Sequence, residues 1–268
     1  MSPRVQYAGL TALLVATLVL VAFALRMPVA GSGAVTGSTV PPTSTSSPVS
    51  TLQSFTPGPR AASHSEVATL GEGTRVAFIG DSFTAGAGAS SEQARWTTVL
   101  SAEHKWSEEN FGRAGIGYLR AGRTSDCTAQ TCAAYPALVP QVVAGRPALV
   151  VITGGANDLG LDLTQLGAAV TQTVKSIKDG VPGVRVVVVN PWWDMRPNDQ
   201  RLAAYTQAIQ RAATDAGATW LDTAQPLMGK SELMTADGMQ PNDKGHEAIA
   251  TSVGRGLAQA GVMVIAVE

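Results

Sequence analysis

A serine stands where an apolar run ends in a glycine-rich turn: Ser82, in residues 80–86 (GDSFTAG). A hydroxyl just beyond the end of a strand is well placed to act as a nucleophile in acyl transfer. Serine is also a favoured helix N-cap, because its oxygen accepts a backbone N–H. The segment by itself does not choose between a nucleophile and a cap.

Two further segments carry groups that could stabilise a developing negative charge. Asn157 lies in residues 154–159 (GGANDL) and offers a neutral amide donor. Asn and Gly are also common in Asx turns, so a purely structural turn is the alternative. Gly115 lies in residues 110–117 (NFGRAGIG), whose glycines would let a backbone N–H approach a substrate closely or would simply turn the chain.

A fourth segment, residues 236–246 (ADGMQPNDKGH), precedes the last expected helix. Taken together, the four segments resemble the SGNH, or GDSL, family of serine esterases and acyl hydrolases. The resemblance runs from about residue 75 to the end of the chain, with the blocks in the family's order and spacing. Joint occurrence of four blocks is far more specific than any one block.

The resemblance implies a role for each matching residue. Ser82 matches the nucleophile; its own N–H, the N–H of Gly115 and the amide of Asn157 match the oxyanion-hole donors. Asp237 matches the acid that orients the catalytic histidine. The family also implies a three-layer α/β/α, flavodoxin-like fold with about five parallel strands.

The sequence departs from the family at one catalytic position. Gln240 stands where the family has its histidine, and an amide can neither take the proton of Ser82 nor deliver one to a leaving group. His246, six residues further on, is a candidate substitute base, and packing or capping at the start of the last helix is its alternative role.

Two pairs of residues bear on the substrate and on the loop near the site. Trp192 and Trp193 follow an expected strand and offer faces for a sugar ring or walls for an acyl chain; a packed lid over the sheet is the alternative. Cys127 and Cys132 are expected to form a disulfide in an exported protein, with two free thiols as the alternative.

The elements that must position these residues follow from the hydrophobic pattern. Short apolar runs alternate with amphipathic stretches from about residue 69, which predicts parallel strands connected by helices and therefore an α/β domain. Strands are expected at 75–79, 148–153, 184–189 and 219–222, with a weaker one near Asn110. Helices are expected at 91–105, 163–178, 198–216 and 243–260. Sites in such sheets gather at the carboxyl ends of the strands.

The first part of the chain has a different character. Residues 8–25 form an uncharged apolar run within residues 1–30, which predicts a membrane anchor or, if it is cleaved, a signal peptide. Residues 31–68 are rich in Ser, Thr, Pro and Gly and are expected to form a disordered linker. The expected hydrolase-like domain is 69–268. This arrangement would place the domain outside the cytoplasm, anchored to the membrane or secreted.

The amino-acid composition argues against nucleic acid and metal ions as binding partners. With 19 Lys and Arg against 20 Asp and Glu, the chain lacks the positive charge that drives nucleic-acid binding. Two cysteines and three histidines leave little for a metal site, and we expect neither metal nor cofactor.

The leading hypothesis is an exported hydrolase that cleaves an ester on a carbohydrate, lipid or small molecule through an acyl-enzyme on Ser82. The alternatives are an acyltransferase acting on cell-envelope carbohydrate and a catalytically weak binding module. The sequence does not indicate an oligomeric state.

Overall fold

The computed structural model describes residues 70–122, 133–197 and 199–263. The described residues all belong to one compact unit, which is assigned to residues 62–268. The expected membrane segment, the linker and the Cys127–Cys132 disulfide lie outside the described residues. Within the described ranges, no helix is long and apolar enough to cross a membrane.

A five-stranded parallel sheet forms the centre of the domain, in the order β2-β1-β3-β4-β5. This order is typical of the flavodoxin-like fold that the family resemblance implies, and it places a switch point between β1 and β3. The strands are β1 (Arg75–Ile79), β2 (Ser107–Asn110), β3 (Leu149–Ile152), β4 (Arg185–Val189) and β5 (Thr219–Leu221).

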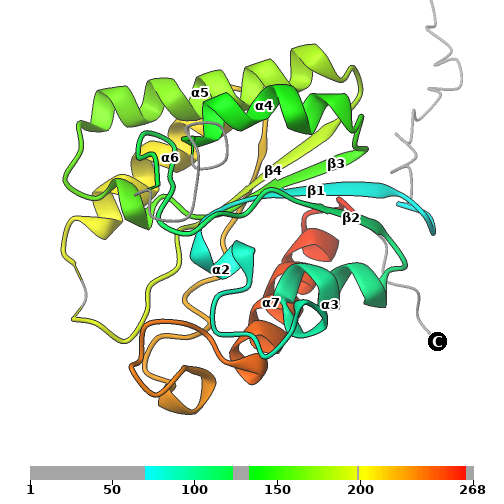
Figure 1. Ribbon diagram of the computed structural model, residues 1–268. Helices are drawn as coiled ribbons and strands as arrows, with labels where there is room; N and C mark the ends of the chain where they lie inside the picture. Colours follow the sequence, from blue (N-terminus) through cyan, green and yellow to red (C-terminus); the bar gives the residue numbers. More distant parts are fainter. Residues whose placement is uncertain (1–69, 123–132, 198, 264–268) are drawn as a thin grey trace, which may run out of the picture. The chain divides into compact units, whose positions relative to one another are not determined.

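Helices cover both faces of the sheet, giving three layers (Figure 1). On one face lie α4 (Tyr135–Ala144), α5 (Leu163–Gly180) and α6 (Leu202–Asp215); on the other lie α3 (Trp96–Glu103) and α7 (Asp243–Gln259). Short pieces complete the order: α2 (Ser82–Ala85) and the 3₁₀ turns η1 (Glu92–Ala94), η2 (Ala156–Asp158) and η3 (Ser231–Leu233).

Burial on both faces explains why the central strands are continuously apolar. In β1, Ala77 and Ile79 pack against the α4–α5–α6 layer, whereas Val76 and Phe78 pack against the α3–α7 layer. All four side chains are fully buried, as expected of parallel strands sandwiched between helices. The edge strand β2 (SEEN) is polar and only partly buried.

The helix α4 was not expected from the sequence. It contains Pro140 in its interior and Pro136 in its first turn, and proline in a helix interior removes a hydrogen bond. Burial of Tyr135, Leu138 and Val142 offsets this local penalty.

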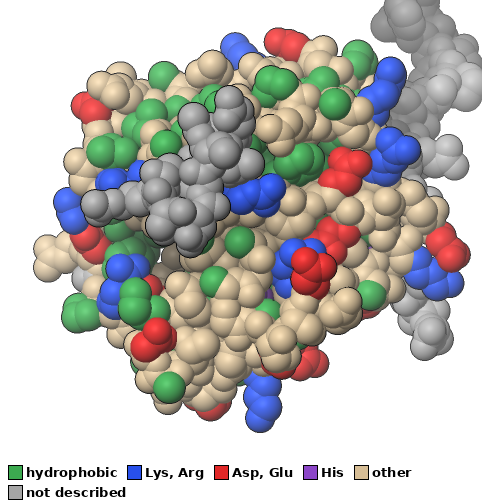
Figure 2. Space-filling view, viewed as in Figure 1, with side chains coloured by type: hydrophobic (Ala, Val, Ile, Leu, Met, Phe, Trp, Pro, Cys, Tyr) green, Lys and Arg blue, Asp and Glu red, His purple; other side chains and the backbone are tan. Residues whose placement is uncertain are grey.

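Charged side chains are interspersed on the face seen in Figure 2, without an extended patch of either sign. This distribution agrees with the formal net charge of −1.

Candidate active site

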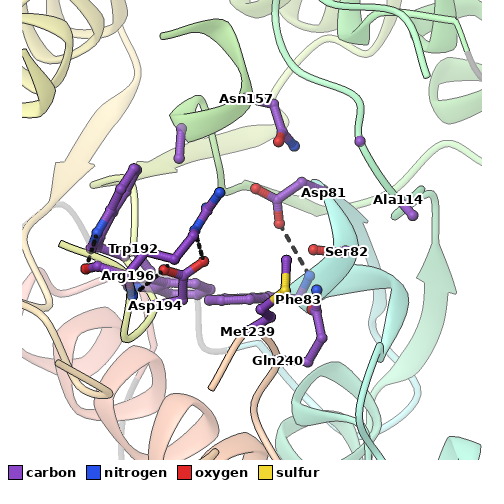
Figure 3. A pocket seen from close by; sticks show the side chains of 13 residues that line it. Asp81, Ser82, Phe83, Ala114, Asn157, Trp192, Asp194, Arg196, Met239 and Gln240 are labelled. Carbon is purple, nitrogen blue, oxygen red and sulfur yellow. Dashed lines mark hydrogen bonds and ion pairs between the residues drawn. The ribbon is translucent and has the colours of Figure 1, made fainter. Parts of the chain in front are cut away.

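A pocket of about 250 Å³ lies beyond the carboxyl ends of β1, β3 and β4. Ser82, Gly115, Asn157 and Gln240, from the four conspicuous segments, all line it, and so do Trp192 and Trp193. Figure 3 shows Ser82, Asn157 and Gln240 around this cavity, although they are far apart in the sequence. The remaining lining residues are Asp81, Phe83, Ala114, Ala156, Asp194, Arg196 and Met239.

Ser82 is the first residue of α2, directly after β1. The turn depends on Gly80, because a Cβ there would come within 2.2 Å of the Thr84 hydroxyl, which is hydrogen-bonded to Thr153 at 2.7 Å. Among the described residues, neither the hydroxyl nor the N–H of Ser82 has a hydrogen-bond partner. Asp81, not Ser82, caps the helix: its Oδ1 accepts from the N–H of Phe83 at 3.1 Å.

The Asp81 carboxyl lines the same pocket as Ser82. Burial raises its pKa from 3.8 to about 6, and the hydrogen bond from Phe83 offsets part of this effect. The negative charge of Asp158 raises the pKa further. Asp81 is therefore a carboxyl group that titrates close to neutrality beside the proposed nucleophile.

Asn157 and Gly115 lie close together because the amide Nδ2 of Asn157 donates to the carbonyl of Ile116 at 2.9 Å. Gly115 has φ +74°, a conformation that glycine adopts without strain. No acceptor is found for its N–H within the described part of the chain. This N–H and the second amide hydrogen of Asn157 are thus free donors, among the described residues, in the pocket that Ser82 also lines.

Asp158 holds these two donor segments together. Its buried carboxylate accepts hydrogen bonds from the N–H groups of Tyr118, Leu119 and Arg120 at 2.8, 3.0 and 2.9 Å. The carbonyl of Asn157 in turn accepts from the Arg120 side chain. The loop after Gly115 is therefore tied to η2, the turn that presents Asn157.

Gln240 reaches the pocket through a tight contact with the loop after α2. A Cβ at Gly88 would lie 2.9 Å from the Gln240 Cβ and 2.2 Å from the Pro241 carbonyl oxygen, so only glycine fits there. The Gln240 Oε1 atom is buried and has no hydrogen-bond partner among the described residues.

Asp237 does not line the pocket. Its exposed carboxylate accepts from the Thr235 hydroxyl at 2.6 Å and from the N–H of Met239 at 3.0 Å, within its own turn. These hydrogen bonds lower the pKa of Asp237, and the hydrogen bond from the Thr235 hydroxyl has the largest effect. Among the described residues, no hydrogen bond joins Asp237 to the Gln240 side chain.

His246 does not line the pocket either, and it is fully buried at the start of α7. Its Nδ1 accepts from the N–H of Trp96 at 3.4 Å, and its Nε2 contacts the carbonyl of Ala87 at 3.1 Å. These partners require a neutral ring protonated on Nε2. Burial, which disfavours the charged ring, lowers its pKa. With both nitrogens engaged, His246 has the geometry of a packing residue, the alternative stated above.

Asp81, Asp194 and Arg196 also line the pocket, although they were not predicted as site residues from the sequence. Asp81 adjoins the nucleophile in the GDS triplet, and the D-x-R spacing of residues 194–196 directly follows the tryptophan pair. Asp81 lies two residues after β1, and Asp194 and Arg196 lie five and seven residues after β4. Charged residues in the loop that follows a strand were therefore the signal that could have found them.

The fold is a doubly wound α/β scaffold with a pocket at the switch point of the sheet. The chain belongs to the GDSL-like lipase/acylhydrolase family, which it matches over residues 78–248. It is 29% identical to a GDSL lipase of Mycobacterium tuberculosis over 191 residues, covering 66% of this chain and 79% of the relative.

Solved structures share the fold at low sequence identity. TesA superposes with a TM-score of 0.55 at 18% identity, covering 70% of this chain and 99% of that chain. A putative arylesterase from Agrobacterium tumefaciens gives 0.54 at 18%, covering 70% and 99%. A family two carbohydrate esterase from Clostridium thermocellum, in complex with cellohexaose, gives 0.55 at 15%, covering 70% and 65%.

Proposed function

We propose that this chain cleaves an ester through an acyl-enzyme on Ser82. The observation that carries the proposal is the convergence of Ser82, the free N–H of Gly115 and the amide of Asn157 on one pocket. In the proposed reaction, the Ser82 Oγ attacks the ester carbonyl and the developing oxyanion accepts hydrogen bonds from these donors and from the Ser82 N–H. The alcohol leaves with a proton, and water then releases the acid.

Gln240 makes the proposed reaction slow, since no imidazole is available at that position to carry the proton. In another serine hydrolase, loss of the catalytic histidine costs on the order of 10⁶-fold in turnover, and the oxyanion hole and binding retain roughly 10³- to 10⁴-fold acceleration over water. We therefore expect a weak activity that depends on Ser82.

A second proposal is a binding module that keeps the family's pocket without turnover. It is favoured by Gln240 and by the engagement of both His246 nitrogens with backbone groups. Transfer of the acyl group to a sugar hydroxyl stays a prediction, because the same pocket would serve it. Export and attachment to a membrane through the N-terminal segment also stay predictions.

The first test compares hydrolysis of p-nitrophenyl acetate by the native chain, Ser82→Ala, Gln240→His and the control Ser252→Ala. Ser252 bonds to Ala248 within α7 and does not line the pocket. We expect native activity to be lost in Ser82→Ala, kept in Ser252→Ala and raised at least about 10-fold in Gln240→His, because the imidazole supplies general-base catalysis.

The outcomes separate the proposals. Native activity that survives Ser82→Ala would overturn the acyl-enzyme proposal. A native rate equal to that of Ser82→Ala, together with a gain in Gln240→His, would favour the binding module.

A further inference from the structure

One wall of the pocket holds an arginine that is fixed in place. The Nε of Arg196 donates to both oxygens of Asp194, at 2.9 and 2.7 Å, and the Arg196 N–H donates to Oδ1 at 2.9 Å. The guanidinium carbon lies 5.0 Å from the centre of the Trp193 ring, a cation–π distance. Figure 3 shows Asp194 and Arg196 at the side of the cavity opposite Ser82.

The arrangement leaves the outer edge of the guanidinium free. Asp194 is 6% exposed and occupies only Nε, whereas the Arg196 side chain is 56% exposed. Among the described residues, its two Nη groups have no partner. The nearby indole N–H groups are already used, since Trp192 donates to the Thr223 hydroxyl at 2.8 Å and Trp193 donates to the Arg196 carbonyl at 3.0 Å. Trp192 and Trp193 are 5% and 7% exposed, which favours the packed lid over open stacking faces, and they add only a small carbon surface to the pocket. Arg196 offers the directed donors.

The charge of the pocket decides what these donors bind. Its charged lining residues are Asp81, Asp194 and Arg196. At pH 7 Asp81, whose pKa is about 6, is mostly ionised, and the charge of Asp194 balances that of the guanidinium, so the three groups together carry a negative charge. An anionic ligand would be repelled by the carboxylates of Asp81 and Asp194 and attracted only by Arg196. A neutral oxygen-rich ligand would gain hydrogen bonds to Nη without this repulsion.

We propose that Arg196 is a specificity-determining residue that binds the hydroxyl and ring oxygens of an uncharged, sugar-like alcohol, at the wall of the pocket that Trp192 and Trp193 back. The inference rests on the proposed function, because the sugar-like group would be the alcohol part of the ester that Ser82 attacks. Its test, however, is binding and requires no turnover.

The experiment titrates three esters into the Ser82→Ala chain by ligand-observed NMR: 6-O-acetyl-glucose, ethyl acetate and the anionic monoethyl succinate. We expect 6-O-acetyl-glucose to bind most tightly. Arg196→Lys keeps a cation beside the buried Asp194 but lacks the guanidinium fork, so it should weaken this binding about 10-fold. The pair Asp194→Asn with Arg196→Gln removes both charges together and should cause the same loss.

The chain provides a matched control in Arg201, which bonds to Asp199 at the same two-residue spacing but does not line the pocket. Arg201→Lys should leave the affinity unchanged. Equal affinity in the Arg196 variants, with unfolding curves confirming that they fold, would overturn the inference, as would tighter binding of monoethyl succinate than of the sugar ester. Arg196-dependent binding without Ser82-dependent hydrolysis would remove only the proposed catalytic function.

Discussion

Asp81 connects the pocket to the stability of the fold. Its pKa in the folded chain, about 6, lies above the ordinary value of 3.8, so between these values the folded state holds a proton that the unfolded state releases. Stability contributed by this group is therefore complete below about pH 4 and falls as the pH rises to about 6. A shift of this size corresponds to at most about 3 kcal/mol.

We accordingly expect Asp81→Asn to be more stable than the native chain at pH 7.5 and nearly equal to it at pH 4, because the Asn oxygen still caps Phe83 and does not titrate. Urea unfolding at both pH values measures the difference. Asp237→Asn is a control of opposite sign, since the hydrogen bond from Thr235 lowers the pKa of Asp237. A difference for Asp81→Asn that does not change with pH would contradict the expectation.

At the same scale, the sequence predicts the site only in part. Motifs place Ser82, Gly115, Asn157 and Gln240 together because a parallel sheet brings strand ends to one edge. The partners of Arg196 were not predictable, because an ion pair depends on how one irregular loop folds after β4. The exact hydrogen bonds of His246 depend likewise on the packing of α7 against the segments around Ala87 and Trp96.

At the scale of elements, η2 and the loop after Gly115 act as one piece because Asp158 bonds three backbone N–H groups. We expect Asp158→Asn to lose about 2 to 3 kcal/mol of unfolding free energy, since one amide oxygen replaces a carboxylate and the NH₂ group faces donors. The Ser82-dependent rate should also fall at least about 10-fold, because the two proposed oxyanion donors, Gly115 and Asn157, lose their common support.

Chemical denaturation and p-nitrophenyl acetate hydrolysis check both effects in the same preparation. Asp162→Asn is the matched control: Asp162 caps α5 by accepting from Gln165, and Asn caps equally well. Its unfolding free energy should stay within about 0.5 kcal/mol of the native value. An Asp158→Asn chain as stable as this control would show that the loop is held by other contacts.

Strands β1, β3 and β4 were predictable because burial of both faces makes them short, continuously apolar runs. β1 has the expected bounds, and β3, β4 and β5 differ from theirs by one residue at one or both ends. Helices α5 and α7 also begin at the expected residues. The exception, α4, forms because Tyr135 and its apolar neighbours fill the layer over the sheet, a tertiary effect that outweighs the local preference against Pro140.

At the scale of the whole molecule, residues 62–268 form one unit that contains every described residue lining the pocket. We expect a chain starting at residue 62 to unfold cooperatively and to show the same Ser82-dependent rate as the full chain, since every described contact of the pocket lies within it. Calorimetry and the ester assay on both proteins make the comparison. A shorter chain that loses cooperativity or activity would assign residues 1–61 a part in the folded domain.

Gln240, which lines the same pocket as Ser82, is separated from histidine by very little at the level of the gene. Codons for glutamine and histidine differ only in their third base, so an imidazole at position 240 is a single nucleotide change away. Error-prone copying of the gene would sample this change without design. A growth selection that requires ester cleavage would then enrich Gln240→His variants if the rest of the pocket is still competent for catalysis. Failure of these variants to become enriched would indicate that more than the histidine is missing.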